Sequence, residues 1–354
     1  MQHNYTNNVY KKNILILGPY PPPLGGVAVH IKRVVNKLKQ QNNIVHIFDT
    51  SIKYQSKLST LKNLIKTIWI SKPNIVYYHE PTELSQKLLI IIFFKYFFRY
   101  KITTIDHDCR LLYNFGRIKK LLFNFIIKRA DNTVVIGDTT DKCYIENNIY
   151  LKSYSVESPF LPPSTQEEES IVQAWPKSIK SFIKTHSPLI SANAFAPIIY
   201  QNQDLYGFYS CINLVEELKK THPNIGVIFG ICKVETKEQK YYFEKINNDI
   251  KEKNLENNFY FFIDKTEFWP IIKQSDVFVR PTLSDSFGIS VQEAVFVGTP
   301  AIASDVCDRP DNTILFKTGD IKDFIEKTRK IIDAKDKIYN PERRQRNSPM
   351  ATDK

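Results

Sequence analysis

The sequence predicts two α/β domains in tandem, each built on a parallel sheet with helices on both faces. The chain has 354 residues, which is enough for two domains of ordinary size. Its composition, 42% hydrophobic and 24% charged, is that of a folded globular protein. Short apolar runs alternate with amphipathic helical stretches along most of the chain. That alternation is typical of parallel sheets that are buried on both faces.

The first domain is predicted over residues 1–163. The apolar run 13–18 has the composition of a strand and ends in glycine and prolines. Residues 25–40 follow as a helix, because their apolar positions approximate one helical stripe. The same alternation predicts further strands at 43–48, 73–79, 101–106 and 133–137, and helices around 84–99 and 117–129.

Five prolines and an acidic run between Pro159 and Pro188 predict a linker over 164–187 that carries one or two helices. The second domain is predicted over 188–340, with a polar tail at 341–354. Its expected strands are 188–195, 225–231, 259–263, 276–281 and 300–304, and its expected helices are 208–222, 239–254 and 291–298. Ligands bind at the carboxyl ends of such strands, so we expect the site in a cleft between two facing domains.

Charge is distributed unevenly along the chain. Residues 1–150 hold 22 Lys and Arg against 9 Asp and Glu, a formal charge of +13, whereas the remainder holds 27 against 28. A basic half indicates a surface for polyanions. Nucleic acid, anionic lipid and a ligand that bears a pyrophosphate all remain open on this ground.

Cysteine usage and apolar runs indicate the compartment. The five cysteines show neither the close pairs of a zinc site nor a disulfide framework, which favours a reducing cytosol. The first twelve residues lack the apolar core of a signal peptide. The longest apolar run, 88–94, has seven residues, whereas a transmembrane helix needs about 20. We therefore expect a cytoplasmic chain that does not span a membrane.

The segment 277–306 is the most informative for chemistry. A strand runs into a polar loop, and Phe287-Gly288 then opens a helix that has Asp285 before its first turn and Glu293 within it. The N–H groups at a helix start bind phosphate, and ionised carboxylates accept hydrogen bonds from sugar hydroxyl groups. The alternative is that Asp285 only caps the helix and that Glu293 is solvated.

This segment resembles the signature of the group 1, or family 4, retaining glycosyltransferases: two Glu separated by seven residues, Phe-Gly after the first and Gly-Thr-Pro downstream. In this chain the first acid is Asp285. The resemblance extends to the Gly25-Gly26 loop and to residues 72–79, 103–108 and 130–137. It implies the GT-B fold of two facing Rossmann-like domains, with an acceptor-binding N-terminal domain and a C-terminal domain that binds a nucleotide-sugar.

The resemblance also implies roles for individual residues. Glu293 would receive the ribose hydroxyls, and Asp285 would face the donor sugar. The donor would also contact the residues that flank the helix start and end, Ser286, Phe287, Gly288 and Thr299. The family's Arg and Lys for the diphosphate are missing, because residues 185–218 contain neither residue type. We expect Arg280 or Arg309 to replace them, with a structural or surface ion pair as the alternative for each.

Three features of the first domain are candidates for the site. Gly25-Gly26 lacks the spacing of a dinucleotide site, which argues against NAD or FAD. The resemblance implies that this loop lies beside the donor phosphate or the acceptor, with a simple tight turn as the alternative. His107, within Asp106-His107-Asp108, matches a family histidine close to the transferred sugar, so the resemblance favours it as an active-site hydrogen-bonding residue over metal binding or a structural role. His79 could contact the acceptor together with Glu80, or it could be structural.

Two basic aromatic stretches, 95–101 and 116–130, would suit the surface of an anionic membrane. An ordinary core helix with a charged outer side is the alternative. The resemblance favours the membrane, because many relatives act on lipid-linked acceptors at the cytoplasmic membrane face.

These observations lead to one functional hypothesis: a retaining, metal-independent glycosyltransferase, without a cofactor, that builds a surface polysaccharide such as O-antigen or capsule. A UDP- or GDP-sugar would donate to a lipid-linked saccharide at the inner face of the cytoplasmic membrane. The retaining front-face mechanism is implied by the resemblance. A nucleotide-sugar epimerase of similar architecture and a basic nucleic-acid-binding protein are the alternatives, although no nucleic-acid-binding motif is present. The donor sugar, the linkage and the oligomeric state stay open.

Overall fold

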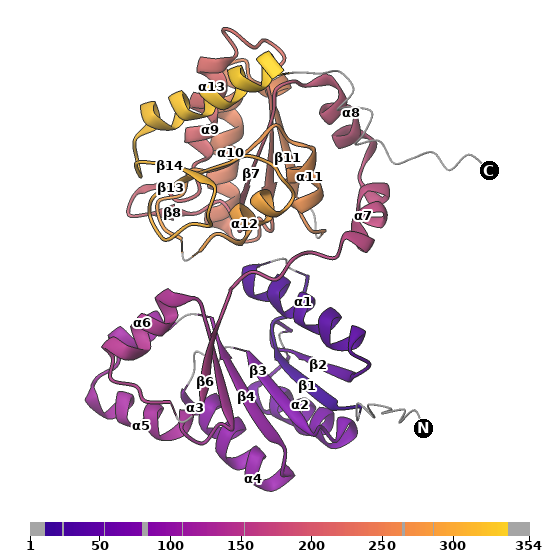
Figure 1. Ribbon diagram of the computed structural model, residues 1–354, viewed down its shortest axis with the longest axis vertical. Coiled ribbons are helices and arrows are strands. Elements are labelled where there is room, and N and C mark those ends of the chain that lie inside the picture. The colour runs from indigo at the N-terminus through magenta and orange to yellow at the C-terminus, as the bar shows by residue number, and fades with distance from the viewer. Residues whose placement is uncertain are drawn as a thin grey trace, which may run out of the picture. The chain divides into compact units, whose positions relative to one another are not determined.

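The computed structural model describes residues 11–22, 25–52, 54–79, 84–107, 109–151, 153–263, 266–285 and 287–338. The chain divides into two compact units, with the boundary between Leu161 and Pro162. Each unit is a six-stranded parallel sheet with helices on both faces (Figure 1). The α/β class and the two-domain organisation predicted from the sequence are confirmed.

The first unit has the strand order β2-β1-β3-β4-β5-β6, and every neighbouring pair is parallel. The central strands are buried on both faces, which explains why they appear as continuous apolar runs. Their bounds are β1 (Asn13–Gly18), β2 (Ile44–Asp49), β3 (Ile75–His79), β4 (Lys101–Asp106), β5 (Asn132–Ile136) and β6 (Tyr154–Glu157).

Alternate residues of β1 separate the two helical layers. Ile14 and Ile16 pack against α1 (Gly26–Gln40), whereas Leu15 and Leu17 belong to the cluster on the other face. That second cluster includes apolar residues of α2 (Lys57–Ser71), the π-helix η1 (Leu88–Phe94), α5 (Arg117–Ile127) and α6 (Asp138–Glu146). Short helices α3 (Leu84–Lys87) and α4 (Lys95–Phe98) flank η1, and η2 (Arg110–Asn114) precedes α5.

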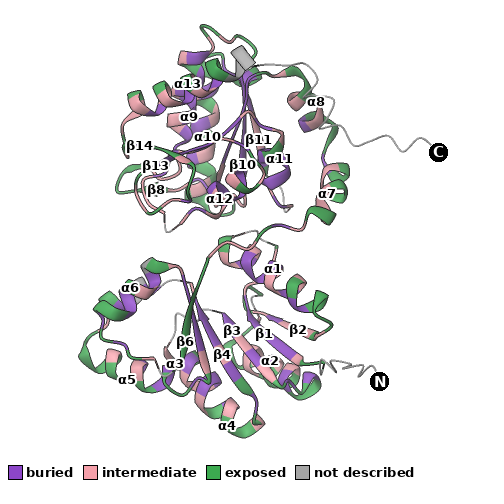
Figure 2. Ribbon diagram, in the orientation of Figure 1, coloured by how far each residue is buried: buried purple, intermediate pink, exposed green. Residues whose placement is uncertain are grey.

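The second unit has the strand order β11-β10-β7-β12-β13-β14, again with parallel neighbours. Burial follows the sheet in both units, with buried residues along the central strands and exposed residues on the outer helix faces (Figure 2). The strand bounds are β7 (Leu189–Ala194), β10 (Gly226–Ile231), β11 (Phe259–Ile263), β12 (Val277–Arg280), β13 (Ala301–Ser304) and β14 (Thr313–Phe316), with a hairpin of β8 (Ile199–Tyr200) and β9 (Gln203–Asp204).

The residues expected to form a linker, 164–187, contain the 3₁₀ turn η3 (Thr165–Glu167) and helices α7 (Glu168–Ala174) and α8 (Lys177–Thr185). Trp175 and Ile179 are buried in one cluster with Leu189 of β7. The helices therefore belong to the second unit. Its other helices are α9 (Phe208–Leu218), α10 (Lys237–Glu252), η4 (Glu256–Asn258), α11 (Trp269–Gln274), α12 (Ile289–Phe296) and α13 (Ile321–Ile338).

The sequence pattern did not indicate the edge strands β6 and β14 or the hairpin. All four residues of β6 are exposed, so no apolar run marks this strand. β14 is partly exposed at its start and middle. Edge strands bury little surface, and their hydrogen bonds come from the neighbouring strand rather than from their own hydrophobicity.

Candidate functional site

Arg280 lies at the carboxyl end of β12, one of the two central strands of the second sheet. It is the last residue of β12, and β12 is paired with β7 and β13. Because the three strands are parallel, their carboxyl ends meet at one edge of the sheet. Helix α12 begins close to this edge, directly after the loop that follows β12. This edge is where doubly wound sheets bind ligands.

The Arg280 side chain joins two strand ends and the loop. Its Nε donates to Asp285 Oδ2 at 3.0 Å, and its Nη1 donates to the backbone oxygen and Oδ1 of Asn193 at 2.8 and 2.9 Å. Ser290, in the first turn of α12, donates from Oγ to the same Asn193 Oδ1 at 3.0 Å. The guanidinium lies 5.2 Å from the ring centre of Tyr206. Arg280 is therefore held in one orientation beside the start of α12.

Arg309 approaches the same carboxylate from the loop after β13. Its Nη1 donates to Asp285 Oδ2 at 2.9 Å, and its Nε donates to the Ser304 backbone oxygen at 3.0 Å. Its side chain is 1% exposed. Gly288 has a φ of 77°, and a Cβ at this position would clash with Arg309 Nη1. Glycine at the helix start thus makes room for the second arginine.

Asp285 is the shared anion of this cluster. Burial by itself would raise the pKa of its carboxyl group, but the charges and hydrogen bonds of Arg280 and Arg309 outweigh burial and leave the pKa below its usual value. Burial acts against the charged form of Arg280 as well, yet the attraction of Asp285 leaves the pKa of Arg280 raised. Asp285 and Arg280 are therefore charged at neutral pH. Two guanidinium groups against one carboxylate give the cluster a formal charge of +1.

The other donor-binding candidates lie around α12. Glu293 is on α12 and is buried, as is Ser290 one turn earlier. The backbone oxygen of Phe287 accepts from Arg309 Nη1 at 3.4 Å. The hydroxyl of Thr299 donates to the Ile272 backbone oxygen at 2.9 Å, so it links α12's end to α11. Ser286 lies outside the described residues.

Lys233 is a further cation at this edge that sequence reasoning missed. It follows β10, its backbone N–H donates to the Phe195 oxygen at 3.1 Å, and its Nζ lies 4.8 Å from the centre of the Phe195 ring. Phe195 is two residues from Asn193, the residue that holds Arg280. A lysine two residues after the apolar run 225–231 was the available signal, since it places a cation near a strand end.

In the first unit, three histidines meet at the carboxyl edge of the sheet. His79 is the last residue of β3 and His107 directly follows β4; His79 Nδ1 and His107 Nε2 are 3.1 Å apart and form a hydrogen bond. The ring of His30, on α1, lies edge-on to His107 with 4.8 Å between ring centres. His30 Nδ1 also contacts the Pro159 oxygen at 3.2 Å. His79 Nε2 is buried without a hydrogen-bond partner among the described residues.

The environment keeps these imidazoles neutral. Burial, with a contribution from His30, lowers the pKa of His107 to about 3. Burial, followed by repulsion from the other two rings, holds the pKa of His79 well below its ordinary value. Burial also lowers the pKa of His30, with a smaller effect from Arg33. At neutral pH the cluster can donate or accept hydrogen bonds but carries no charge.

Asp106, the first residue of the Asp-His-Asp sequence, is used in a buried ion pair. Lys87 Nζ lies 3.2 Å from its Oδ1, and the hydroxyl of Tyr144 donates to its Oδ2. Asp108 and the predicted acceptor contact Glu80 lie outside the described residues. Of the two glycines of the first loop, Gly26 is the first residue of α1 and Gly25 directly precedes it.

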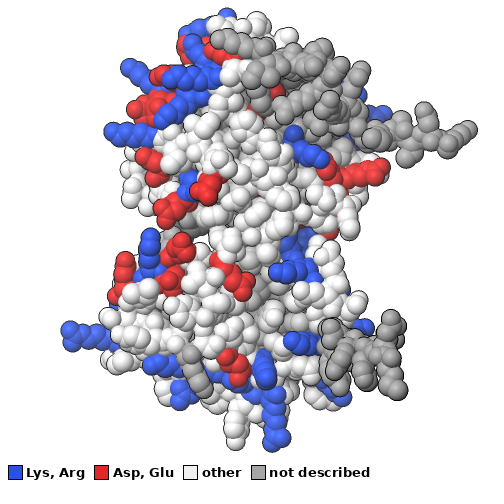
Figure 3. Space-filling view, in the orientation of Figure 1, with Lys and Arg blue, Asp and Glu red and all other residues white. Residues whose placement is uncertain are grey.

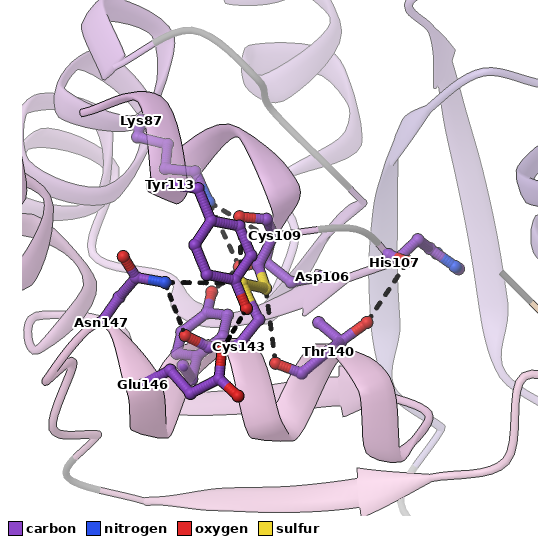
Figure 4. Close-up of a disulfide and its surroundings, with 10 residues drawn as sticks. Lys87, Asp106, His107, Cys109, Tyr113, Thr140, Cys143, Glu146 and Asn147 are labelled. Carbon is purple, nitrogen blue, oxygen red and sulfur yellow. Dashed lines mark hydrogen bonds and ion pairs between the residues drawn. A yellow bond between two sulfur atoms is a disulfide. The ribbon is translucent and has the colours of Figure 1, made fainter. Parts of the chain in front are cut away.

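A disulfide joins Cys109 and Cys143. This corrects the expectation that the cysteines form no disulfide, which rested on their wide spacing. The two cysteines are 34 positions apart in the sequence, and they meet because α6 packs beside the segment that follows β4. Figure 4 shows the bond next to the Lys87–Asp106 pair, with the His107 ring pointing away from it. Thr140 of α6 donates to the His107 backbone oxygen at 3.5 Å. The disulfide thus ties α6 to the segment that carries His107.

Comparisons with known proteins bear on the fold of the chain and on its second unit. Residues 203–348 match the family of glycosyl transferases group 1. No curated protein matches the sequence. A glycosyltransferase from Rickettsia africae is similar in structure at 13% identity, with a TM-score of 0.67 over 92% of this chain and 89% of that one. Anabaena Alr3699/HepE in complex with UDP-glucose is 12% identical, with a TM-score of 0.63 over 92% and 91%.

A UDP-forming α,α-trehalose-phosphate synthase from Burkholderia xenovorans is 10% identical, with a TM-score of 0.61 over 91% of both chains. At such identities the likeness shows the fold, which these glycosyltransferases share. The chain therefore has the GT-B fold, and residues 203–348, which lie in its second unit, match the family model of glycosyl transferases group 1.

Proposed function

We propose that the chain is a retaining, metal-independent glycosyltransferase that uses a nucleotide-diphosphate sugar. Its acceptor is a lipid-linked saccharide, and its product is a bacterial surface polysaccharide such as O-antigen or capsule. The Arg280–Asp285–Arg309 cluster beside the start of α12 is the observation that carries the proposal.

The cluster supplies the positive charge that a departing diphosphate requires. Both guanidinium groups are fixed by Asp285, so neither has to reorganise when a ligand binds. Lys233, whose Nζ lies 3.5 Å from Glu235 Oε2, adds a further basic side chain near Asn193 and Phe195. Amide groups at the start of α12 are suited to phosphate oxygens. Together these groups take the place of the Arg and Lys that are missing from residues 185–218.

The two acids then divide the recognition of the donor. Glu293 lies within α12 and accepts the ribose hydroxyls. Asp285, kept ionised by the two arginines, faces the donor sugar and orients both cations. The similarity to a structure of Anabaena Alr3699/HepE that contains UDP-glucose favours a UDP-sugar as the donor to test first.

In the first unit, the neutral His107 is the hydrogen-bonding group for the transferred sugar, and His79 orients its ring. In a front-face transfer the leaving phosphate oxygen takes the proton of the acceptor hydroxyl. The protein's part is then to position the reactants and to stabilise charge. In this proposal no metal ion takes part, and the arginine cluster and the amide groups at the start of α12 together offset part of the diphosphate charge.

Thermal shift with UDP, GDP and their sugar conjugates tests donor binding. A ligand at a hundred times its Kd stabilises by about 2.7 kcal/mol, which raises Tm by roughly 5–10 °C for a unit of this size. Arg280→Ala should abolish the shift. Arg329→Ala, which removes an exposed ion pair to Glu217 in the same unit, is the matched control and should retain it. An unchanged shift in Arg280→Ala would contradict the proposal.

Transfer is then measured with the donor identified in this way. Labelled sugar should appear in the lipid fraction when membranes are supplied, in the presence of EDTA, and the product linkage should keep the anomeric configuration of the donor. A nucleotide-sugar isomer formed from donor alone, without any acceptor, would instead show an epimerase.

A further inference from the structure

Helix α5 carries two apolar stripes, of which the fold uses only one. Phe123, Ile126 and Ile127 are buried in the core of the first unit. A second stripe at positions i, i+3 and i+7, formed by Ile118, Leu121 and Phe125, is between 49% and 82% exposed. A surface helix of a globular protein normally places one apolar stripe towards the core and polar residues outside. The outer side of α5 is therefore not that of an ordinary core helix.

The neighbouring segment has the same character. Phe93, Tyr96 and Phe97, on η1 and α4, are between 60% and 88% exposed. The two segments are adjacent, because η1 contacts α5 and because Lys95 Nζ donates to the Arg129 backbone oxygen at 2.7 Å. We call the surface formed by the exposed apolar residues Phe93, Tyr96, Phe97, Ile118, Leu121 and Phe125, together with the Lys and Arg around them, the basic apolar face.

Helix α2 lies on the same side of the sheet as these segments, since its Leu64 and Ile68 share their core cluster. It also points large apolar residues outward, among them Leu58 and Trp69. α2, η1 with α4, and α5 of this layer thus all expose apolar side chains. Scattered apolar residues are normal on a protein surface, but a group of them on contacting segments such as η1 and α5 indicates an interaction site.

The charges around this face are mostly positive. Residues 84–131 contain ten Lys and Arg and three Asp. Asp106 is buried and paired with Lys87, Asp131 is paired with Lys95 at 2.9 Å, and Asp108 lies outside the described residues. The Arg129 guanidinium lies 3.4 Å from the Phe125 ring centre, so its charge sits at the edge of the apolar stripe. In Figure 3, Lys and Arg also gather at the end of the first unit that carries α4.

We propose that the basic apolar face docks the chain onto a bilayer that contains anionic lipid. Aromatic and aliphatic side chains bordered by Lys and Arg match the interfacial region of such a membrane, where apolar groups enter the acyl boundary and cations remain at the headgroups. An acidic protein would satisfy the charges but leave the large aliphatic side chains in water. Within the described residues no helix is long and apolar enough to cross a bilayer.

Vesicle flotation of the full chain tests this assignment. The purified protein is mixed with vesicles of phosphatidylcholine alone or with 30% phosphatidylglycerol, a composition of about one anionic lipid in three, and the bound fraction is measured. Binding should require the anionic lipid and should weaken as ionic strength rises from 0.1 to 1 M, over which the Debye length falls from about 10 to about 3 Å.

Matched substitutions test whether vesicle binding depends on the apolar residues of this face or on exposed apolar residues in general. Ile118→Ser with Tyr96→Ser should lower the partition coefficient at least tenfold, on the order of the apolar area removed. Ile145→Ser with Tyr241→Ser removes the same residue types from other helices, where they are 63% and 73% exposed, and should leave binding unchanged. All four side chains are exposed, so none of the variants should impair folding; circular dichroism verifies this.

A second pair tests the charges. Lys119→Gln should weaken binding about fivefold, since one Lys near an anionic surface contributes about 1 kcal/mol. Lys240→Gln, on α10 of the second unit, should have no effect. Both lysines are exposed.

The proposal is overturned if the parent chain does not float with anionic vesicles, or if both double variants bind equally well. It is also overturned if sedimentation shows a dimer that Ile118→Ser with Tyr96→Ser dissociates while no vesicles are bound, because the face then joins two copies of the chain. Vesicle binding needs no sugar donor. The result is therefore independent of whether the arginine cluster binds a nucleotide.

Discussion

The histidine cluster of the first unit predicts a specific loss of stability in acid. His79 and His107 have lowered pKa values, about 3 in the case of His107, so both are neutral in the folded chain at pH 5.5. In the unfolded chain the imidazole pKa returns to about 6.5. Below this pH the unfolded chain binds more protons than the folded chain. Stability is therefore complete above about pH 7 and is lost as pH falls from 6.5 towards the folded pKa.

The magnitude follows from linkage. Lowering the pH from 7.5 to 5.5 costs about 1.4 kcal/mol for each histidine that remains neutral in the fold. His79 and His107 together cost roughly 3 kcal/mol by the same relation. His30 acts in the same direction, because burial lowers its pKa too. A loss of this size is large against a total stability of about 5–15 kcal/mol for a domain.

Hydrogen exchange in urea measures this loss of stability in the first unit of the chain separately from the second. Peptides that span β3 and β4 report unfolding of the first unit alone, and their unfolding free energies are compared at pH 7.5 and 5.5. The double variant His79→Gln with His107→Gln should lose most of the difference between the two pH values. His222→Gln, in the second unit, is the control and should leave these peptides as in the parent chain.

Two results would refute the reasoning. One is an equal unfolding free energy of the parent chain's first unit at both pH values. The other is an NMR titration that places the pKa of either ring near 6.5 in the folded chain.

Three further predictions concern single substitutions. Gly288→Ala should destabilise the second unit by about 1–3 kcal/mol in urea and weaken donor binding, because of the positive φ and the clash with Arg309; an unaltered urea midpoint would contradict this. Lys87→Met should cost about 3–5 kcal/mol by leaving the buried Asp106 charge unpaired, and adding Asp106→Leu should restore part of it. Cys143→Ser should cost about 4 kcal/mol through the opened loop. Titration of the unfolded, unreduced parent should find three free thiols, and five would contradict the disulfide.

The strands of both sheets could be located from sequence wherever they are buried. Residues 13–18 and 101–106 match β1 and β4 residue for residue, because burial on both faces demands an apolar run. The helix start after Asp285 was also predictable, since Phe287-Gly288 marks it locally. The exposed edge strand β6 has no such mark.

Which residues form the arginine cluster and the histidine cluster could be seen only in the tertiary structure. Arg280 was a candidate from its place before the loop, but only folding shows that Arg309, 24 residues after Asp285, reaches the same oxygen. His30 was not assigned to the site, and it meets His107 because α1 packs against the sheet that carries β4. Cys109 and Cys143 are joined because α6 packs beside the segment that follows β4.

The sequence by itself determined the α/β class, the chain's division into two sheets and the acidic pair on either side of a helix start, because these depend on local periodicity and on residues close together in the chain. The tertiary structure alone decided which charges share a partner, which histidines touch and which stripe of α5 faces water. Periodicity marks an apolar stripe, but whether that stripe is buried depends on the elements that lie against it.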